Sequence, residues 1–256
     1  MCVLAFAWRA DPRWPLVVAG NRDELHVRPA QPLARWDRPP DLLAGRDLQS
    51  GGSWLGVSER GQFTAVTNLR GYGMPKSGRV SRGALVTDLL SGEGNYADLH
   101  KAELSHFNPF NLIVVDGESA HFVSNRPNNV RTLLAPGIYG LSNGTLDEPW
   151  PKTLRLKQRL LEWLIKGVPH PELLLDDLRE ESLPEIGLRT TVPSDVPQEP
   201  PLSPIFIRNP VYGTRCSTIV AVDDQGRGTI IERRYTAAGD VAGETALSFS
   251  WPVSKQ

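Results

Sequence analysis

The sequence predicts an α+β fold of mainly antiparallel sheets with helices packed outside them. Three observations support this class: β-prone segments recur in pairs joined by short turns, the strongest helical segments lie mid-chain, and strands resume after them. Neither a G-x-G-x-x-G nor a Walker pattern occurs, which argues against a doubly wound nucleotide-binding fold. A chain of 256 residues buries enough surface to fold without disulfides or a metal.

The first part of the chain predicts two hairpins. A turn-like Ala-Asp-Pro-Arg separates the first two apolar segments, and Gly61 supplies the left-handed residue in the turn of the second hairpin. The Pro- and Arg-rich stretch 28–40 predicts an ordered loop between these hairpins. The expected strands are 2–8, 15–20, 54–57 and 62–68.

The middle and end of the chain predict helices followed by further strands. Ser81 is expected to cap a helix that runs to Leu90, and Asn95 to cap another that runs to Leu104. Pro149 or Pro151 opens a strong helix to Lys166, and a shorter helix is expected over 171–179. The remaining expected strands are 111–115, 120–124, 217–222, 229–235 and one near 246–249.

Residues 182–210 hold seven prolines and predict a long loop, because proline interrupts regular elements. The sequence shows no internal repeat and no low-complexity tract. We therefore expect one domain over residues 1–256 with this Pro-rich loop inside it.

Composition narrows the classes of partner. The formal net charge is −1, which removes the general attraction to nucleic acid and to anionic membrane surfaces. The longest apolar runs fall far short of the ~20 residues that a membrane span requires. The start of the chain has no signal-peptide pattern, so we expect a cytoplasmic protein whose two cysteines, Cys2 and Cys216, are free thiols.

Cys2 is the most informative residue for chemistry. Aminopeptidases remove Met1 before a small residue, and Cys2 would then carry a thiol and an α-amine together. Such an amine titrates near neutral pH and can act as base for the neighbouring thiol. The alternative is a small buried residue on a first strand.

Other polar residues are candidates for completing such a site. Asp23 ends the second strand, which antiparallel pairing brings beside Cys2. Arg22 precedes it, on the opposite face if the strand alternates regularly. Taken singly, Asn68 and Asn143 are more typical of turns than of oxyanion binding. By itself, Asn21-Arg22-Asp23-Glu24 is most simply a solvated, charged hairpin end.

These residues together resemble the NRDE family, also called the transport and Golgi organization 2 family. The resemblance covers essentially the whole chain, in order. It is carried by Met1-Cys2, Gly20-Asn21-Arg22-Asp23-Glu24, Trp54-Leu55-Gly56, Thr67-Asn68, Leu141-Ser142-Asn143 and Gly213-Thr214-Arg215-Cys216-Ser217-Thr218.

The pattern is more distantly similar to N-terminal nucleophile hydrolases of the penicillin V acylase and bile salt hydrolase type. That similarity implies an αββα four-layer sandwich and hydrolysis of an amide, or a thioester, through an acyl-enzyme. It also implies a role for each matching residue: Cys2 as nucleophile, Asp23 holding its α-amine, Asn68 stabilising the oxyanion, Asn143 positioning substrate or amine, and Arg215 supporting the thiolate.

One position departs from the acylase pattern. The acylases carry an arginine three residues before the aspartate, where this chain has Gly20, whereas Arg22 directly precedes Asp23 here. Arg22 therefore either reaches the site from a distorted strand end or is a structural ion-pair partner. Asn21 is a further candidate from the same tetrapeptide.

The family resemblance also implies a non-catalytic alternative. NRDE members are associated with haem trafficking and with lipid or acyl-CoA homeostasis, so haem and acyl-CoA are candidate ligands beside an acyl amide substrate. Catalysis needs no cofactor, and the five histidines lack zinc-ligand spacing, so no metal site is expected. The basic residues of the long helix are expected on its solvated face, with an anion-binding patch as the alternative: Lys152, Arg155, Lys157 and Arg159.

Overall fold

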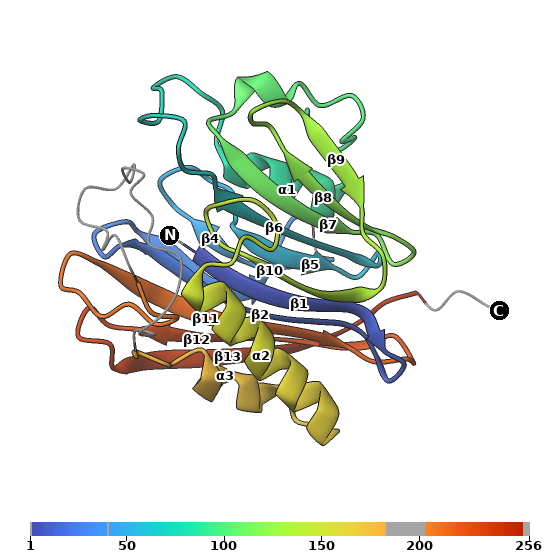
Figure 1. The fold of residues 1–256 in the computed structure, drawn as a ribbon. Coiled ribbons are helices and arrows are strands. Elements are labelled where there is room, and N and C mark those ends of the chain that lie inside the picture. The colour runs from blue at the N-terminus through green and yellow to red at the C-terminus, as the bar shows by residue number, and fades with distance from the viewer. Residues whose placement is uncertain (1, 40, 183–202, 253–256) are drawn as a thin grey trace.

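The computed structural model describes residues 2–39, 41–182 and 203–252 and arranges them in four layers (Figure 1). Two antiparallel sheets lie face to face. Helix α1 (Arg82–Ser91) covers the outer face of one sheet, and α2 (Pro151–Lys166) with α3 (Leu174–Asp177) covers the outer face of the other. This confirms the expected αββα sandwich.

The two sheets are each built from sequential hairpins and returning strands. The first sheet has the order β10-β1-β2-β11-β12-β13 in the described ranges: Gly137–Leu141, Cys2–Asp11, Trp14–Leu25, Tyr212–Val222, Arg227–Tyr235 and Val241–Ser250. The second sheet runs in sequence order from β3 to β9: Ala30–Arg35, Leu42–Asp47, Leu55–Ser58, Gln62–Asn68, Phe110–Val115, Ala120–Ser124 and Val130–Leu133.

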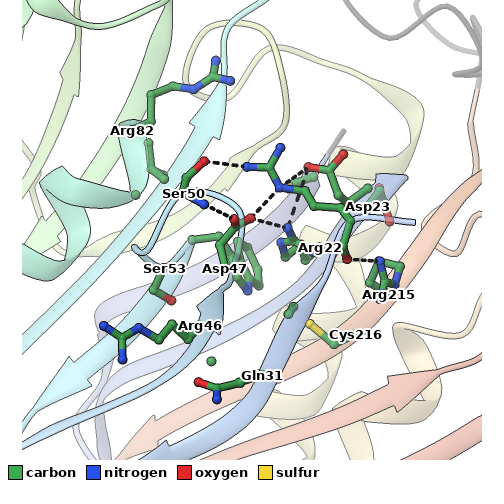
Figure 2. Close-up of a pocket in the computed structure, with 18 of the residues that line it drawn as sticks. Arg22, Asp23, Gln31, Arg46, Asp47, Ser50, Ser53, Arg82, Arg215 and Cys216 are labelled. Atoms are coloured by element: carbon green, nitrogen blue, oxygen red, sulfur yellow. Dashed lines mark hydrogen bonds and ion pairs between the residues drawn. The ribbon is translucent and has the colours of Figure 1, made fainter. Parts of the chain in front are cut away.

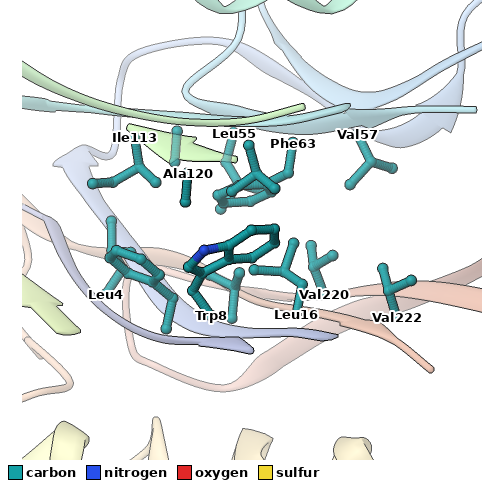
Figure 3. Close-up of a cluster of buried hydrophobic side chains, with 14 of the residues drawn as sticks. Leu4, Trp8, Leu16, Leu55, Val57, Phe63, Ile113, Ala120, Val220 and Val222 are labelled. Carbon is teal, nitrogen blue, oxygen red and sulfur yellow. The ribbon is translucent and has the colours of Figure 1, made fainter. Parts of the chain in front are cut away.

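The apolar residues of strand β1 follow one another without interruption and are buried on both faces of the sheet. Leu4, Phe6 and Trp8 point into the core between the sheets, shown in Figure 3, where they meet the second sheet. Val3 and Ala5 point to the other face and pack under α2. Because both faces of the first sheet are covered, the alternation of β1 is between large and small apolar residues.

The expected hairpins and the two strongest helices are confirmed. The side chain of Ser81 accepts from the Gly83 N–H at the start of α1, and Gly92 ends it with φ 65°. Gly61 takes φ 90° in the β5–β6 turn. These positions follow local backbone chemistry, which is why the sequence identifies them.

Two sequence predictions are wrong. Stretch 28–40 is not wholly a loop, because β3 (Ala30–Arg35) pairs with β4 as the edge of the second sheet, where Pro32 is tolerated. Residues 95–104 form no helix and lead only into a 3-10 turn, Leu104–His106. The carboxylate of Asp88 holds the Tyr96 N–H, and that of Asp98 holds the His100 N–H, so side chains satisfy this backbone instead.

Four further elements depart from the expected pattern. The 171–179 helix is only a 3-10 turn, Pro171–Leu173, followed by the four residues of α3. Strands β4, β9 and β10 were not predicted. Strand β9 has only four residues, all of them exposed, so it shows no alternation between a buried and a solvated face.

The Pro-rich loop falls mostly outside the described residues, which omit 183–202. Its described end, 203–210, forms no regular element, although Ile205, Phe206 and Ile207 are buried against the first sheet. In the described ranges, no helix combines the length and apolarity that a bilayer span requires.

Candidate active site

A cavity of about 470 Å³ opens beside the first residue of β1. Cys2 lines it, together with Arg22 and Asp23 from β2, Asn68 from the end of β6, and Arg215 from β11. Figure 2 shows the cavity between these strands and the second sheet. The structure thus brings together residues that lie more than 200 positions apart in the chain.

The backbone of Cys2 is held by side chains from the segment that follows β10. The N–H of Cys2 donates to Oδ1 of Asn143 at 3.3 Å, and Oγ of Ser142 donates to the Cys2 carbonyl at 2.8 Å. Asn143 in turn donates from Nδ2 to the carbonyl of Asn68 at 2.8 Å. Because β10 pairs with β1, the end of β10 reaches this strand start, and it links Cys2 to Asn68.

The sulfur of Cys2 accepts a hydrogen bond and lies in a buried environment. The backbone N–H of Asp23 donates to this thiol. Burial raises the pKa of Cys2 above its ordinary value, and the nearby Arg22 opposes that rise. The resting thiol is therefore neutral near pH 7, and a nucleophilic role requires a base.

The carboxyl of Asp23 is buried at 3% exposure. Thr214 donates from Oγ1 to Oδ1 of Asp23 at 2.7 Å, and Tyr212 donates to its carbonyl at 2.9 Å. Burial raises the pKa of Asp23, while the charge of Lys152 acts in the opposite direction. Asp23 therefore depends on neighbouring cations to stay ionised.

Lys152 is the functional candidate that sequence reasoning missed. It was expected on a solvated helix face, but it is only 2% exposed, in the first turn of α2. Burial lowers its pKa to about 8, and the charge of Asp23 opposes that shift. Its spacing from Leu156 and Leu160 places it on the buried stripe of the helix, a signal that the sequence does contain.

Arg22 lines the cavity and also forms ion pairs that connect the sheets. It lies opposite Cys2 in the β1–β2 register, so both side chains share the face that looks toward the second sheet. Its Nη2 lies 3.1 Å from a carboxylate oxygen of Asp47 on β4 and 3.7 Å from Glu24. Both roles expected for Arg22 are thus compatible with its position.

Gly20 lies where β2 passes close to β1, opposite Leu4, and a side chain there would be crowded. A Cβ there would lie 2.9 Å from Cβ of Leu4 and 3.0 Å from the carbonyl oxygen of Val3. On β2, Arg22 is accordingly the arginine that faces the cavity.

Arg215 occupies a bulge in β11, where Thr214 pairs with Asp23 and Cys216 pairs with Arg22. Its Nη1 donates to the carbonyls of Leu25 and Arg28 at 2.8 and 2.9 Å. Burial and then the charge of Arg22 lower its pKa. The bulge fixes a cation in the cavity wall, near the end of β2.

Asn21 does not join this group. Its Nδ2 donates to the carbonyls of Leu178 and Ile205, and its Oδ1 accepts from Ser217, all on the helix side of the first sheet. The side chain is fully buried there. Asn21 therefore anchors the segment around Ile205 to the sheet.

Solved structures share this fold at low sequence identity. They include a Caenorhabditis elegans N-acylethanolamine-hydrolyzing acid amidase ortholog, with TM-score 0.52, 13% identity and coverage of 85% of this chain and 92% of that one. A C2A mutant of conjugated bile acid hydrolase from Clostridium perfringens matches with TM-score 0.51, 10% identity and coverage of 100% and 99%. Penicillin V acylase from Agrobacterium tumefaciens matches with TM-score 0.50, 13% identity and coverage of 91% of this chain and 83% of that one.

Sequence comparison gives a more specific result. The model of the Transport and Golgi organisation 2 family matches residues 1–237. The Transport and Golgi organization protein 2 homolog of Bos taurus is 34% identical over 96% of this chain and 97% of its own length. The Homo sapiens homolog is also 34% identical, over 91% of this chain and 92% of its own length. The resemblance found in the Cys2 and Asn21-Arg22-Asp23-Glu24 motifs is confirmed, and the chain belongs to the Transport and Golgi organisation 2 family.

Proposed function

We propose that the protein hydrolyses an amide bond of a small molecule, with Cys2 as nucleophile after removal of Met1. One observation carries the proposal: the nitrogen of Cys2 donates to Asn143 at 3.3 Å while its thiol lines the cavity. Removal of Met1 would turn that nitrogen into an α-amine beside the sulfur. The shared fold with acylases and amidases supports the same reaction class.

The proposed first half-reaction forms a thioester. The α-amine of Cys2 accepts the thiol proton, the sulfur attacks the amide carbon, and the negative charge moves to the carbonyl oxygen. When the tetrahedral intermediate collapses, the carbon–nitrogen bond breaks and the ammonium returns its proton to the leaving amine. Water then attacks the thioester, with the α-amine again as base, and releases the acid and the free thiol.

The surrounding residues supply the groups that these reaction steps require. The Asn68 side chain lines the cavity at the end of β6, where its amide N–H groups are suited to an oxyanion. Asn143 and Asp23 would orient the α-amine, and Arg215 adds positive charge to the wall. Lys152 would keep Asp23 ionised in its buried position.

Ligand binding without turnover is the second candidate, because burial raises the pKa of the Cys2 thiol and leaves it neutral. For haem, the cavity offers a sulfur donor in Cys2 and arginines for the propionates, and no histidine is among its described lining residues. Haem titration should then shift the Soret band in the wild type and leave the Cys2→Ala variant without that shift. An unshifted Soret band at micromolar haem would contradict haem binding.

The catalytic proposal is tested by mass spectrometry combined with hydrolysis assays. Protein made in cells should lack Met1, and incubation with a panel of N-acyl amides should yield an acyl adduct on the Cys2 peptide. Turnover should disappear in Cys2→Ala, because the nucleophile is removed, and persist in Cys216→Ala. Protein that retains Met1 when isolated would contradict the amine-base mechanism.

A further inference from the structure

The charge of the cavity differs in sign from the charge of the chain. Seven arginines and four carboxylates are among its described lining residues, whereas the whole chain has a formal net charge of −1. The cavity therefore carries an excess of positive charge that the composition does not suggest. A concave site lined by one sign of charge raises the local concentration of oppositely charged ligands.

The arginines fall into two groups by their contacts. Arg22 and Arg28 share the carboxylate of Asp47 at 3.1 and 2.5 Å, and Arg234 lies 3.3 Å from Glu232. These three charges are compensated within the cavity wall.

The second group includes Arg46 and Arg79, which make contacts of another kind. Arg46 donates to the carbonyl of Gly51 at 3.4 Å and stacks 4.5 Å from the ring centroid of Trp36. Arg79 donates to the carbonyl of Ser105 at 2.5 Å. Carbonyl contacts hold a guanidinium in place without neutralising its charge.

These two arginines lie on the side of the cavity formed by the second sheet and the start of α1. Arg46 comes from β4, and Arg79 precedes the Ser81 cap, while Arg82 follows it. Figure 2 shows Arg46 and Arg82 across the cavity from Asp23, Arg215 and Cys216. Apolar surface from Trp54, Val66 and Val80 also lines the cavity.

We propose that the cavity selects an amphipathic acyl amide whose polar end carries an oxyanion, a carboxylate or a phosphate, bound by Arg46 and Arg79. Guanidinium groups pair with both oxyanions through two parallel hydrogen bonds, and the apolar lining suits the acyl chain. A volume of about 470 Å³ matches a ligand of this size. The inference rests on the proposed function for the identity of the scissile amide, but the oxyanion selectivity is a property of binding.

Binding is therefore measured on full-length Cys2→Ala protein, which cannot form the acyl-enzyme. The probes share one acyl chain: N-decanoylethanolamine is neutral, N-decanoylglycine carries a carboxylate, and N-decanoyl-O-phosphoethanolamine carries a phosphate. Calorimetry should give at least one anionic probe a Kd about 10- to 100-fold lower than the neutral probe, the range for charge-assisted hydrogen bonds. The comparison of the two anions identifies the preferred oxyanion.

The double variant Arg46→Gln/Arg79→Gln, made in the same background, should lose most of that preference and keep its weak affinity for the neutral probe. Arg227→Gln is the matched control, because Arg227 is 76% exposed at its side chain and pairs with Asp223 outside the cavity. The control should keep the full preference for the anion.

Three results would overturn the inference: equal binding of neutral and anionic probes, no measurable binding of either anion at millimolar concentration, or an unchanged preference in the double variant. A hydrolysis assay on the wild type separates this inference from the proposed function. Selective anion binding without release of decanoic acid would support the cavity assignment and contradict amide hydrolysis.

Discussion

The two strands that flank β2 each place a cysteine opposite the same residue. Cys2 at the start of β1 and Cys216 within β11 both pair with Arg22, so both thiols share its face and line the cavity. Their backbones differ. Cys2 lies where the described part of β1 begins, and side chains of Asn143 and Ser142 hold its N–H and carbonyl. Cys216 lies inside β11, between β2 and β12.

This difference makes Cys2 the candidate nucleophile and leaves Cys216 as the candidate packing residue. Burial raises the pKa of both, and that of Cys216 lies well above its ordinary value, with Glu232 adding to the rise. Both positions hold a cysteine, and both side chains point to the same face of the sheet. The two positions differ in the hydrogen bonds that Asn143 and Ser142 make to the Cys2 backbone. The following predictions test whether these polar contacts decide the roles of the two thiols.

Among the residues around Cys2, the largest effect is expected at Asn68. Asn68→Ala should lower turnover by roughly two to three orders of magnitude, the range observed when one oxyanion donor is removed. Steady-state kinetics on an amide that the wild type hydrolyses measures this loss, which should appear mainly in kcat. Asn128→Ala, at an exposed turn, is the matched control and should be neutral. Equal rates for Asn68→Ala and wild type would leave Asn68 as a turn residue.

The sequence predicts this site better than it predicts the sheet edges around it. The family resemblance singles out Cys2, Asp23, Asn68 and Arg215, and all four line one cavity in the structure. The helix caps at Ser81 and Gly92 were also predictable, because local backbone chemistry decides them. Strand β9 was not, since its four residues are all exposed and no buried face marks it as a strand that pairs with β8.

The orientations of three side chains could not be derived from strand or helix type alone. Asn21 and Arg22 are neighbours, yet Asn21 points to the helix layer and Arg22 into the cavity, and only the observed register with Cys2 decides which is which. The charge of Lys152 predicts a solvated position, although its helical spacing matches the buried stripe of α2. Tertiary burial of a charge has no local signal other than that spacing.

The pH dependence of stability tests whether Lys152 is buried beside Asp23, next to the start of β1. The pKa of Lys152 is about 8 in the folded chain against an ordinary value of 10.5, so the unfolded chain binds more protons between these values. Its contribution to the free energy of unfolding should therefore rise as pH increases from about 8 to about 10.5, by up to about 3 kcal/mol.

Urea unfolding of wild type and Lys152→Met across this pH window measures that contribution as the difference between the two slopes. The wild type should gain stability relative to the variant as pH rises. Parallel profiles for the two proteins would show that Lys152 titrates normally and does not sense burial beside Asp23.

Alkylation rates compare the two thiols directly. Cys2 is partly exposed, whereas Cys216 is 6% exposed and its pKa is raised further. Iodoacetamide at pH 8 should modify Cys2 more than about tenfold faster, because both access and thiolate fraction favour it. Peptide mass spectrometry over time distinguishes the sites, and unfolded protein in urea is the control in which the rates should converge. Faster modification of Cys216 would reverse the assignment of the two residues.

The smallest effect is expected for the packing cysteine. Cys216→Ala removes one buried sulfur from the strand between β2 and β12, so it should lower the free energy of unfolding by about 1 kcal/mol. Hydrolysis should remain close to wild type, because the polar contacts of Cys2 with Asn143 and Ser142 do not involve β11. Urea unfolding and the amide assay on the same preparation test both statements. A loss of turnover comparable to that of Cys2→Ala, with stability intact, would mean that both thiols facing Arg22 take part in the reaction.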